Sequence, residues 1–438
     1  MKALVRERKD VLIDVLTLAF IAFLPLALVI AQRKLGLMLI PMTEADIVSI
    51  FALAIIVLAL NLVAGYTGIP HFGMHFFVYI GAFGMSAMAM RLYIATIGFL
   101  DESLREKLLG DEIIKKYATS LMEVLTLATG RSISLRVSDI VGNHAGSSPY
   151  LTLFYIALGL ISSVFLALAF SFLLGLVALR LRGDYLAIFS LIMAEFMVMV
   201  IFHNLETLGG GVYGVSAPRV LPQLAENLRP LGEVLGISSP LALLTALILF
   251  IALVATYAYS IRTSNSPLGR LLRGIRDDEL VVSIFGRDVG VIKMKVILLG
   301  CVIASLAGAL YTLYMASVIP RSFNRMDWTF LPWTMMILGG MANSRGVIVG
   351  ALLVYLIRRL SSSLAPSVFE IFSSLSGFTL EQHTIDQVQA IAPHIVTGAL
   401  VLLVLYLRPQ GLLPEEPSKT LRPKVLSTSF RSSSQESS

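Results

Sequence analysis

The chain has 438 residues, of which 56% are hydrophobic and only 14% are charged, with a formal net charge of +6. Ordinary soluble domains carry about 25% charged residues, so this chain lacks the charge needed to cover a water-exposed surface. A soluble protein with a single core is therefore excluded. The composition predicts an all-α, polytopic transmembrane helical bundle in a lipid bilayer, and the basic excess fits cytoplasmic loops, so no nucleic acid partner is expected.

Apolar runs long enough to span a bilayer occur throughout the chain. A transmembrane helix needs about 20 apolar residues, and runs of this kind occupy residues 11–31, 47–64, 76–100, 151–179, 185–202, 241–261, 296–318 and 391–407. A further stretch, 330–360, is interrupted between Gly339 and Gly346, which predicts two half-length or tilted helices joined by a turn. We therefore expect about 8–10 membrane segments, including broken or re-entrant helices of the kind that mark a translocation path.

The positions of Lys and Arg predict the orientation of these segments. Basic residues cluster before residue 11, within 262–295 and after residue 407. The positive-inside rule places all three clusters in the cytoplasm, so both termini are expected there and the number of crossings is even, about ten. Residues 101–149 then form an extracytoplasmic insertion with an amphipathic helix near 104–118. We predict a transmembrane domain over 1–413, a cytoplasmic loop at 262–295 and a disordered cytoplasmic tail at 414–438.

The cytoplasmic segment 266–286 combines helix signals with mixed polarity. Pro267 suits the first turn of a helix capped by Ser266, and a second short helix from Asp277 to Phe285 is expected to end at Gly286. This second helix is too polar to span a membrane and too apolar to lie free in water. The residues alone leave two interpretations open: it docks in a groove of a partner protein, or it is an ordinary basic cytoplasmic loop.

The same segment resembles the coupling loop of permease subunits of branched-chain amino acid ABC importers, in particular the M-like subunit of the high-affinity Liv type. The matching residues are Ser266, Pro267, Gly269, Arg270, Ile275, Arg276, Asp278, Glu279 and Gly286. The chain departs from the family pattern at Gly274 and at 281–283, where alanine is usual. The resemblance implies docking on an ABC ATPase subunit, with coupling residues Gly269, Arg270, Arg273, Arg276, Asp277, Asp278, Glu279 and Gly286.

Five further segments resemble the same family in the same order, so that the resemblance covers about 47–90 and 170–413 but not 101–149. They are residues 65–73, 179–188, 207–215, 338–351 and 408–413. At 70–73 the chain reads Pro-His-Phe-Gly, where the bacterial form usually has Ser-Leu-Gly-His. The resemblance and the exposed backbone of glycine loops give the predicted substrate path: Gly68, His71, Phe72, Gly73, Thr207, Gly209, Gly210, Gly211, Tyr213, Gly339 and Gly340. The alternative is that these glycines only allow close backbone packing, as we expect for Gly300, Ala304 and Gly308.

Polar side chains inside the apolar runs receive a functional hypothesis because their burial in lipid is costly. His71 and His75 are four residues apart, but a third ligand is missing, so we expect no metal site and favour hydrogen-bonded structural histidines over path lining. For Glu195 we favour an ion pair with Arg180 or Arg182 over a proton-binding role. The single cysteine, Cys301, is expected to be a buried small hydrophobic residue.

These features together predict a transport subunit rather than an enzyme. The chain contains no Gly-x-x-x-x-Gly-Lys-Ser/Thr loop, so we expect it to bind no cofactor and to rely on ATP bound by partner subunits. The resemblance implies three kinds of partner: ABC ATPase subunits, a second homologous permease subunit and an extracytoplasmic solute-binding protein. The predicted cargo is a branched-chain amino acid. The alternatives are a permease of the same family for urea, amides or another small solute, and an ion-driven secondary transporter that uses Glu195 or His71.

Overall fold

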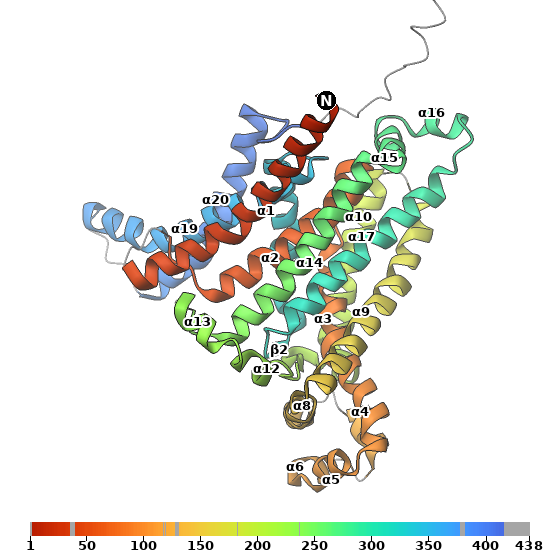
Figure 1. Ribbon diagram of the computed structural model, residues 1–438, viewed down its shortest axis with the longest axis vertical. Helices are drawn as coiled ribbons and strands as arrows, with labels where there is room; N and C mark the ends of the chain where they lie inside the picture. Colours follow the sequence, from red (N-terminus) through yellow and green to blue (C-terminus); the bar gives the residue numbers. More distant parts are fainter. Residues whose placement is uncertain are drawn as a thin grey trace, which may run out of the picture.

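The computed structural model describes residues 2–35, 40–116, 118, 120–127, 131–181, 183–235, 237–376 and 382–415. Within these residues nine helices are long and apolar enough to cross a membrane, which confirms the predicted all-α polytopic bundle (Figure 1). They are α1 (Lys2–Leu35), α2 with η1 (Glu44–Leu60, Asn61–Tyr66), α3 with η2 and α4 (Met74–Phe83, Gly84–Met88, Ala89–Leu100), α9 (Pro149–Ala178), α10 with η3 (Gly183–Glu195, Phe196–Phe202), α14 (Pro240–Asn265), α17 (Val289–Thr312), α19 (Ser344–Ser376) and α20 (Gln382–Leu407).

The helix α2 forms the centre of the bundle. Its sequence is apolar on all sides, a pattern typical of a fully enclosed helix. From residue 46 to residue 67 every position except Ser49 is buried. Thr43 precedes the helix, and its backbone N–H donates to the carboxylate of Asp46 at 2.6 Å, which satisfies one of the free donors at this helix start.

Small residues let the neighbouring helices approach closely. A Cβ atom on Gly308 of α17 would lie 2.0 Å from the carbonyl oxygen of Val78 in α3, and one on Gly81 of α3 would lie 1.8 Å from that of Ser305 in α17. Gly300 faces Val63 in η1 at the same close range. The expected packing role of Gly300 and Gly308 is confirmed, because a Cβ on Gly308 would collide with the backbone of Val78 and one on Gly300 with the side chain of Val63.

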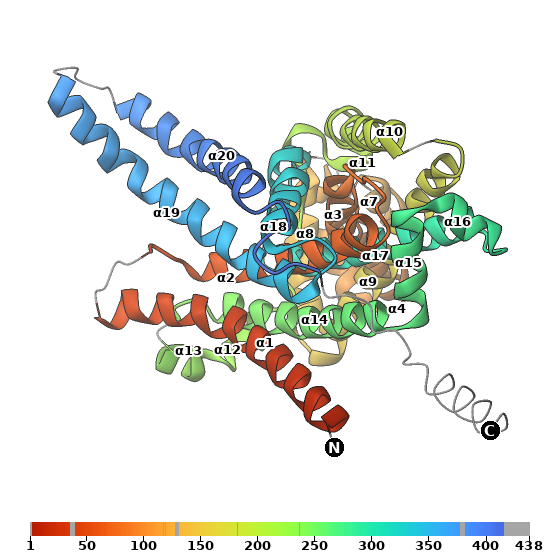
Figure 2. The ribbon, with the colours of Figure 1, turned by 90° about the horizontal axis from the view of Figure 1, so that it is seen from above.

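The interrupted stretch at 330–360 differs from the prediction. The chain passes through η5 (Pro320–Ser322) and η6 (Met326–Phe330) into a short helix, α18 (Leu331–Gly339), and then turns into the long helix α19. The prediction of two half-length helices was therefore wrong for the second one, which continues past residue 360 and pairs with α20 (Figure 2). The predicted span 296–318 also ends early, at Thr312, because residues 317–318 form the strand β2 (Ser317–Val318), antiparallel to β1 (Val215–Ser216).

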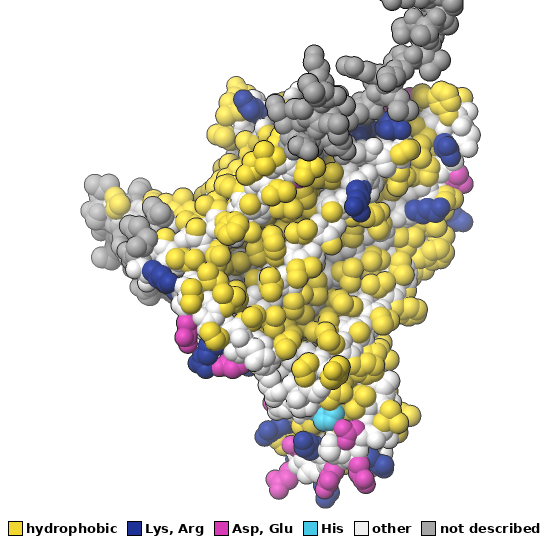
Figure 3. All heavy atoms as spheres, viewed as in Figure 1, with side chains coloured by type: hydrophobic (Ala, Val, Ile, Leu, Met, Phe, Trp, Pro, Cys, Tyr) yellow, Lys and Arg dark blue, Asp and Glu magenta, His cyan; other side chains and the backbone are white. Residues whose placement is uncertain are grey.

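Within the described residues α18 adds a tenth, half-length segment to the nine helices that are long enough to cross a membrane. The start of α1, the end of α20 and the helix pair α15 (Pro267–Asp277) and α16 (Glu279–Ile284) share one face, the upper one in Figure 1. The connection between η3 and α14 lies on the opposite side of the bundle. It contains four short elements: α11 (Glu206–Gly209), η4 (Gly211–Tyr213), α12 (Pro222–Glu226) and α13 (Arg229–Leu235). Between the two ends, Figure 3 shows a broad band of hydrophobic side chains, with Lys, Arg, Asp and Glu gathered at the margins, as expected of a bilayer-embedded protein.

The described residues between 101 and 148 form a small helical cap on the face opposite α15 and α16 (Figure 1). It contains α5 (Glu102–Gly110), α6 (Glu112–Lys115), α7 (Leu121–Leu127) and α8 (Arg131–Gly146). The predicted single helix near 104–118 is divided in two, because Asp111 accepts hydrogen bonds from Ile113 and Ile114 and starts a new helix. The apolar residues Leu104, Leu108 and Ile114 are buried beneath these helices.

A hydrogen-bonded histidine ties this cap to the end of the third span. The Nδ1 atom of His144 lies 2.9 Å from the hydroxyl of Tyr93, and its Nε2 atom lies 2.9 Å from a carboxylate oxygen of Asp101. Asp101 also accepts from the backbone of Ser103 at the start of α5. The hydrogen bonds that Ser103 and His144 donate hold the pKa of the Asp101 carboxyl below its usual range, because they stabilise its charged form.

Candidate functional site

The loop between η1 and α3 carries predicted path residues into the interior of the bundle. Phe72 stacks on the ring of Trp333 in α18 with centroids 4.7 Å apart, and its backbone N–H donates to Ser190 in α10 at 3.0 Å. A Cβ on Gly73 would lie 2.7 Å from the carbonyl oxygen of Ser190. The loop is thus held between α10 and α18, with little free space around Gly73.

Both histidines of this region are buried. The Nε2 atom of His71 lies 3.8 Å from the sulfur of Cys301, which is itself fully buried as expected. His75 contacts the hydroxyl of Thr329 through both its backbone N–H and its Nδ1 atom, each at 3.1 Å. Among the described residues no cluster of three or more His, Cys, Asp or Glu side chains is arranged to hold a metal ion. The geometry around His75 fits the favoured hydrogen-bonded role.

Glu195 has different partners from those predicted. One carboxylate oxygen lies 3.5 Å from Nε2 of His75, and the other lies 3.8 Å from the guanidinium of Arg325. The predicted partner Arg180 lies in the turn between α9 and α10, at the opposite end of α10 from Glu195. The other predicted partner, Arg182, lies outside the described residues. The sequence alone could not identify these partners, because His75 and Arg325 are far from Glu195 in the chain and come close to it only when the protein is folded.

The other predicted path residues fall in three separate places. Gly68, with a positive φ of 72°, lies against the side chain of Arg276 in α15. A second group lies in α11 and η4, before β1, and consists of Gly209, Gly210, Gly211 and Tyr213. The backbone of Thr207 is part of α11, and its side chain lies outside the described part of the structure. Gly339 and Gly340 pack against the backbones of α19 and the C-terminal segment 408–415. The close-packing interpretation accounts for Gly339 and Gly340, since a Cβ on either would lie about 2 Å from a backbone oxygen.

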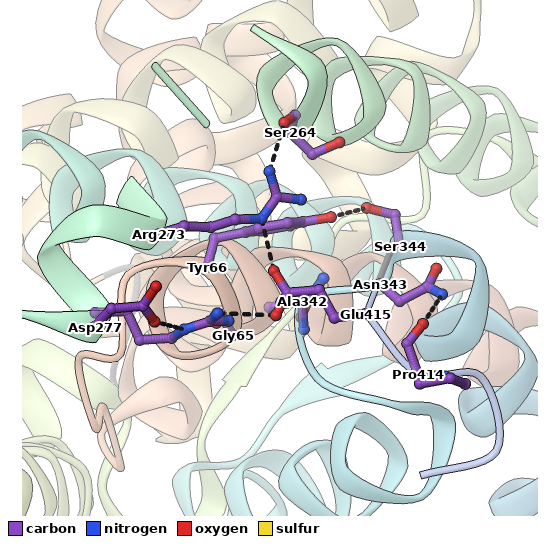
Figure 4. A network of polar contacts seen from close by, with 12 residues as sticks. Gly65, Tyr66, Ser264, Arg273, Asp277, Ala342, Asn343, Ser344, Pro414 and Glu415 are labelled. Atoms are coloured by element: carbon purple, nitrogen blue, oxygen red, sulfur yellow. Dashed lines mark hydrogen bonds and ion pairs between the residues drawn. The ribbon is translucent and has the colours of Figure 1, made fainter. Parts of the chain in front are cut away.

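The first helix of the predicted coupling segment, residues 266–286, packs against the bundle and buries Gly269, Leu272 and Ile275. Ser266 caps α15 by accepting from the N–H of Gly269, and Pro267 follows at the first turn, which confirms both predictions. Arg273 donates to one oxygen of Glu415 at 2.6 Å, and Arg276 donates to the other at 2.8 Å. Figure 4 shows the side chain of Arg273 beside Glu415. Arg273 and Arg276, which the resemblance assigned to docking on a partner, therefore form ion pairs within this chain.

The same network joins three distant parts of the chain. Arg276 also donates to the carbonyl oxygen of Gly65 at the end of η1, at 3.0 Å. The amide of Asn343 donates to the carbonyl oxygen of Pro414 at 2.9 Å (Figure 4). Leu412 and Leu413 donate backbone hydrogen bonds to the carbonyl oxygens of residues 338 and 339 in α18. The predicted disordered tail, 414–438, is therefore wrong for Pro414 and Glu415, which are hydrogen-bonded to the bundle. Residues 416–438 lie outside the described residues.

The second helix of the coupling segment projects apolar side chains from the bundle. Asp278 caps α16 by accepting from the N–H groups of residues 280 and 281, so the helix begins two residues later than predicted. Gly286 ends it with a positive φ of 74°. Ile284 is 75% exposed and Phe285 is 80% exposed. Of the other predicted coupling residues, Arg270 and Asp277 belong to α15, and Glu279 begins α16 and forms an ion pair with Lys293 of α17.

Sequence reasoning missed four charged residues near the other end of the bundle. Arg358 and Arg359 lie within the membrane-spanning part of α19, where they pair with Asp327 and Asp46 respectively. The available signal was the adjacent Arg-Arg pair itself. It closes an apolar run, where intramembrane charge is costly unless it is paired or lines a cavity.

The fold and these sites define a class of protein: a multi-pass membrane permease with a broken helix in its interior and an amphipathic helix projecting from one face. The sequence model of the family described as "Branched-chain amino acid transport system / permease component" matches residues 42–405. The chain belongs to this family and is a permease subunit of the ABC-importer type, as the resemblance predicted.

Curated relatives agree with this assignment. The chain is 30% identical over 379 residues to the probable branched-chain amino acid transport permease protein LivM of Methanocaldococcus jannaschii, covering 86% of this chain and 94% of the relative. It is 28% identical over 260 residues to the high-affinity LivM permease of Escherichia coli, covering 57% of this chain and 55% of that protein. The LivM permease of Salmonella typhimurium is also 28% identical, over 257 residues, which are 56% of this chain and 54% of that protein. No solved structure gives a significant match.

Proposed function

We propose that this permease carries branched-chain amino acids across the membrane and that α16 docks on a separate ABC ATPase subunit. The cargo is proposed from the family and from the relatives named LivM. The docking proposal is carried by one observation: Leu280, Val281, Ile284 and Phe285 are exposed on a short helix beyond the hydrophobic band. Such a helix is costly to leave in water, and a groove on a partner would cover it.

In this proposal the permease binds no ATP, and its energy comes from the partner ATPase. A second homologous permease completes the path, and a solute-binding protein delivers the cargo on the opposite side. The face with α15 and α16 is then cytoplasmic, and both termini lie on that side. Arg273 and Arg276 act inside the chain, because they connect α15 with Glu415 and with the end of η1.

The decisive experiment reconstitutes the permease with its ATPase and permease partners in proteoliposomes and measures uptake of radiolabelled leucine with ATP inside. Phe285→Asp places a charge in the proposed docking groove. We expect binding of the ATPase subunit to weaken about tenfold or more, as for a buried interface aromatic, and uptake to fall with it. Leu100→Asp is the matched control, because Leu100 is 83% exposed at the end of α4, far from α16.

Each result discriminates between functions. Normal uptake by the Phe285→Asp variant would contradict the docking role of α16. Uptake that is independent of the ATPase and follows an ion gradient would support the secondary-transporter alternative. Preferential uptake of urea or short amides over leucine would retain the ABC mechanism and replace the proposed cargo.

A further inference from the structure

A charged cavity opens between α2, the end of α17, η6, α19 and α20. Its volume is about 430 Å³, which lies within the range of small-molecule binding sites. Its lining combines charge with apolar and aromatic surface: Asp327, Arg358 and Arg359 stand beside Leu53, Trp328 and Leu331. A cavity that carries both signs of charge next to apolar walls suits a ligand with the same combination.

The charges of this cavity lie deep in the bundle. Arg358 is fourteen positions beyond Ser344, where α19 begins, which places it about 21 Å along a helix axis from the side of α15. The hydrocarbon core of a bilayer is about 30 Å thick. Arginine at such a depth faces the protein interior or a water-filled space rather than lipid. The cavity therefore belongs to the half of the bundle opposite α15 and α16.

One ion pair in the cavity keeps free hydrogen-bonding capacity. Arg358 donates from one terminal nitrogen to Asp327 at 2.5 Å, and the other carboxylate oxygen of Asp327 accepts from Asn324 at 2.8 Å. A guanidinium has five N–H donors. Within the described part of the chain the Arg358 guanidinium forms no other hydrogen bond, so its remaining N–H donors are available to the cavity that it lines.

The neighbouring pair, Arg359 and Asp46, has a structural role. Arg359 donates to the carbonyl oxygen of Pro41 at 2.9 Å and lies 3.3 Å from Asp46. Asp46 also accepts from the backbone N–H of Thr43 and from the hydroxyl of Tyr355. This contrast separates a structural pair from the Asp327–Arg358 pair, which lines the open space and keeps unused guanidinium donors; the Asp327 oxygen that accepts from Arg358 also lies 3.9 Å from Nε2 of His394.

We infer that this cavity binds the zwitterionic head of an amino acid, with Arg358 contacting the carboxylate and Asp327 contacting the ammonium group. Leu53, Trp328 and Leu331 line the same space and would contact an aliphatic side chain. The inference rests on the proposed function, because it gives the imported amino acid a place to be received from the side opposite the ATPase. Neither single charge would suffice, since a buried zwitterion needs both of its charges paired.

The test measures ligand-induced thermal stabilisation of the full-length chain, assembled with its transporter partners in lipid nanodiscs and without the solute-binding protein. Leucine is compared with 4-methylpentanoate, which lacks the ammonium group, and with 3-methylbutylamine, which lacks the carboxylate. The variant Asp327→Asn/Arg358→Gln removes both charges together, because a single change leaves an uncompensated buried charge and endangers folding. The control Glu226→Gln/Arg229→Gln removes an exposed ion pair on α12 and α13.

We expect leucine to stabilise the wild type and the control, and each single-charge analogue to have a much smaller effect. The double variant should unfold at the wild-type temperature without ligand and bind leucine about tenfold or more weakly. Equal stabilisation of the double variant, or equal stabilisation by the analogues, would overturn the inference. So would a wild type that leucine does not stabilise although the transporter imports leucine. Leucine binding that is lost in the double variant, in a transporter that imports no leucine, would support the cavity and contradict the proposed function instead.

Discussion

The contact between Glu415 and the two arginines of α15 gives the sharpest prediction about how α15 and the C-terminal segment work together. Glu415 joins Arg273 and Arg276 to the segment that is bonded to the end of α18. If α15 moves with an attached ATPase, this carboxylate passes the movement to the interior of the bundle. The variant Glu415→Ala removes the connection and leaves both helices in place.

The size of the effect follows from the contacts. The three side chains are between 15% and 28% exposed, so each ion pair is worth more than a fully exposed one and less than a buried one, about 1 kcal/mol. The two together amount to about 2 kcal/mol, or roughly thirtyfold in an equilibrium constant. Neither arginine is left without a partner, because Arg273 still donates to Ser264 and Arg276 still donates to Gly65. The protein should therefore fold.

The assay is the amount of leucine imported for each ATP hydrolysed by the reconstituted transporter. We expect Glu415→Ala to keep ATP hydrolysis while import per ATP falls several-fold, and Glu415→Gln, which keeps one acceptor oxygen, to lie between it and the wild type. Glu226→Ala is the control, since Glu226 forms an exposed pair with Arg229 outside this network. An unchanged import ratio and an unchanged thermal unfolding temperature in Glu415→Ala would refute the reasoning.

Two further predictions concern packing and pH. Gly81→Ala would place a Cβ 1.8 Å from the carbonyl oxygen of Ser305, so α3 and α17 must separate and the protein should lose about 1–3 kcal/mol of stability; thermal unfolding in detergent measures this. Gly398→Ala has nothing within 4 Å and should be neutral or slightly stabilising. The hydrogen bonds that lower the pKa of Asp101 from its ordinary 3.8 stabilise the folded cap above that pH, and this stability is lost as pH falls through the lower folded-state pKa. Hydrogen exchange of α5 and α8 between about pH 5 and pH 3 should show the loss, and Asp101→Asn should abolish its pH dependence.

The membrane-spanning helices were predictable because a run of apolar residues has few alternatives once it is about 20 residues long. The broken stretch at 330–360 shows the limit of this reasoning. The glycines at 339–340 located the turn, but the end of α19 was misjudged because Arg358 and Arg359 interrupt the apolar run. They do not interrupt the helix, since their charges are met by Asp327, Asp46 and the carbonyl of Pro41. These partners are remote in sequence, so the hydropathy pattern could not reveal them.

The local structure of segment 266–286 was the part of the candidate site best predicted from sequence, whereas its coupling role stays a prediction. Its two helices, the cap at Ser266 and the glycine stop at Gly286 depend on residues that are adjacent in the chain. The partners of charged residues were not predictable in this way. Glu195 pairs with His75 and Arg325, and the choice among several basic residues is made by how α3, α10 and the loop before α18 pack. Local signals specify caps and turns, whereas ion pairs across the bundle depend on the completed fold.

The position of α18 connects the two ends of the proposed mechanism. At one end, residues 338 and 339 accept the backbone hydrogen bonds of the C-terminal segment that carries Glu415. At the other end, η6 runs directly into α18 and carries Asp327, the acidic partner of Arg358 in the cavity. A helix of nine residues moves as a nearly rigid unit, so displacement of α15 and Glu415 would shift Asp327 relative to Arg358 on the long helix α19. Separating the two charges would weaken a site that needs both to hold a zwitterion, and the proposed movement of α15 with an attached ATPase would then release the cargo from its receiving cavity.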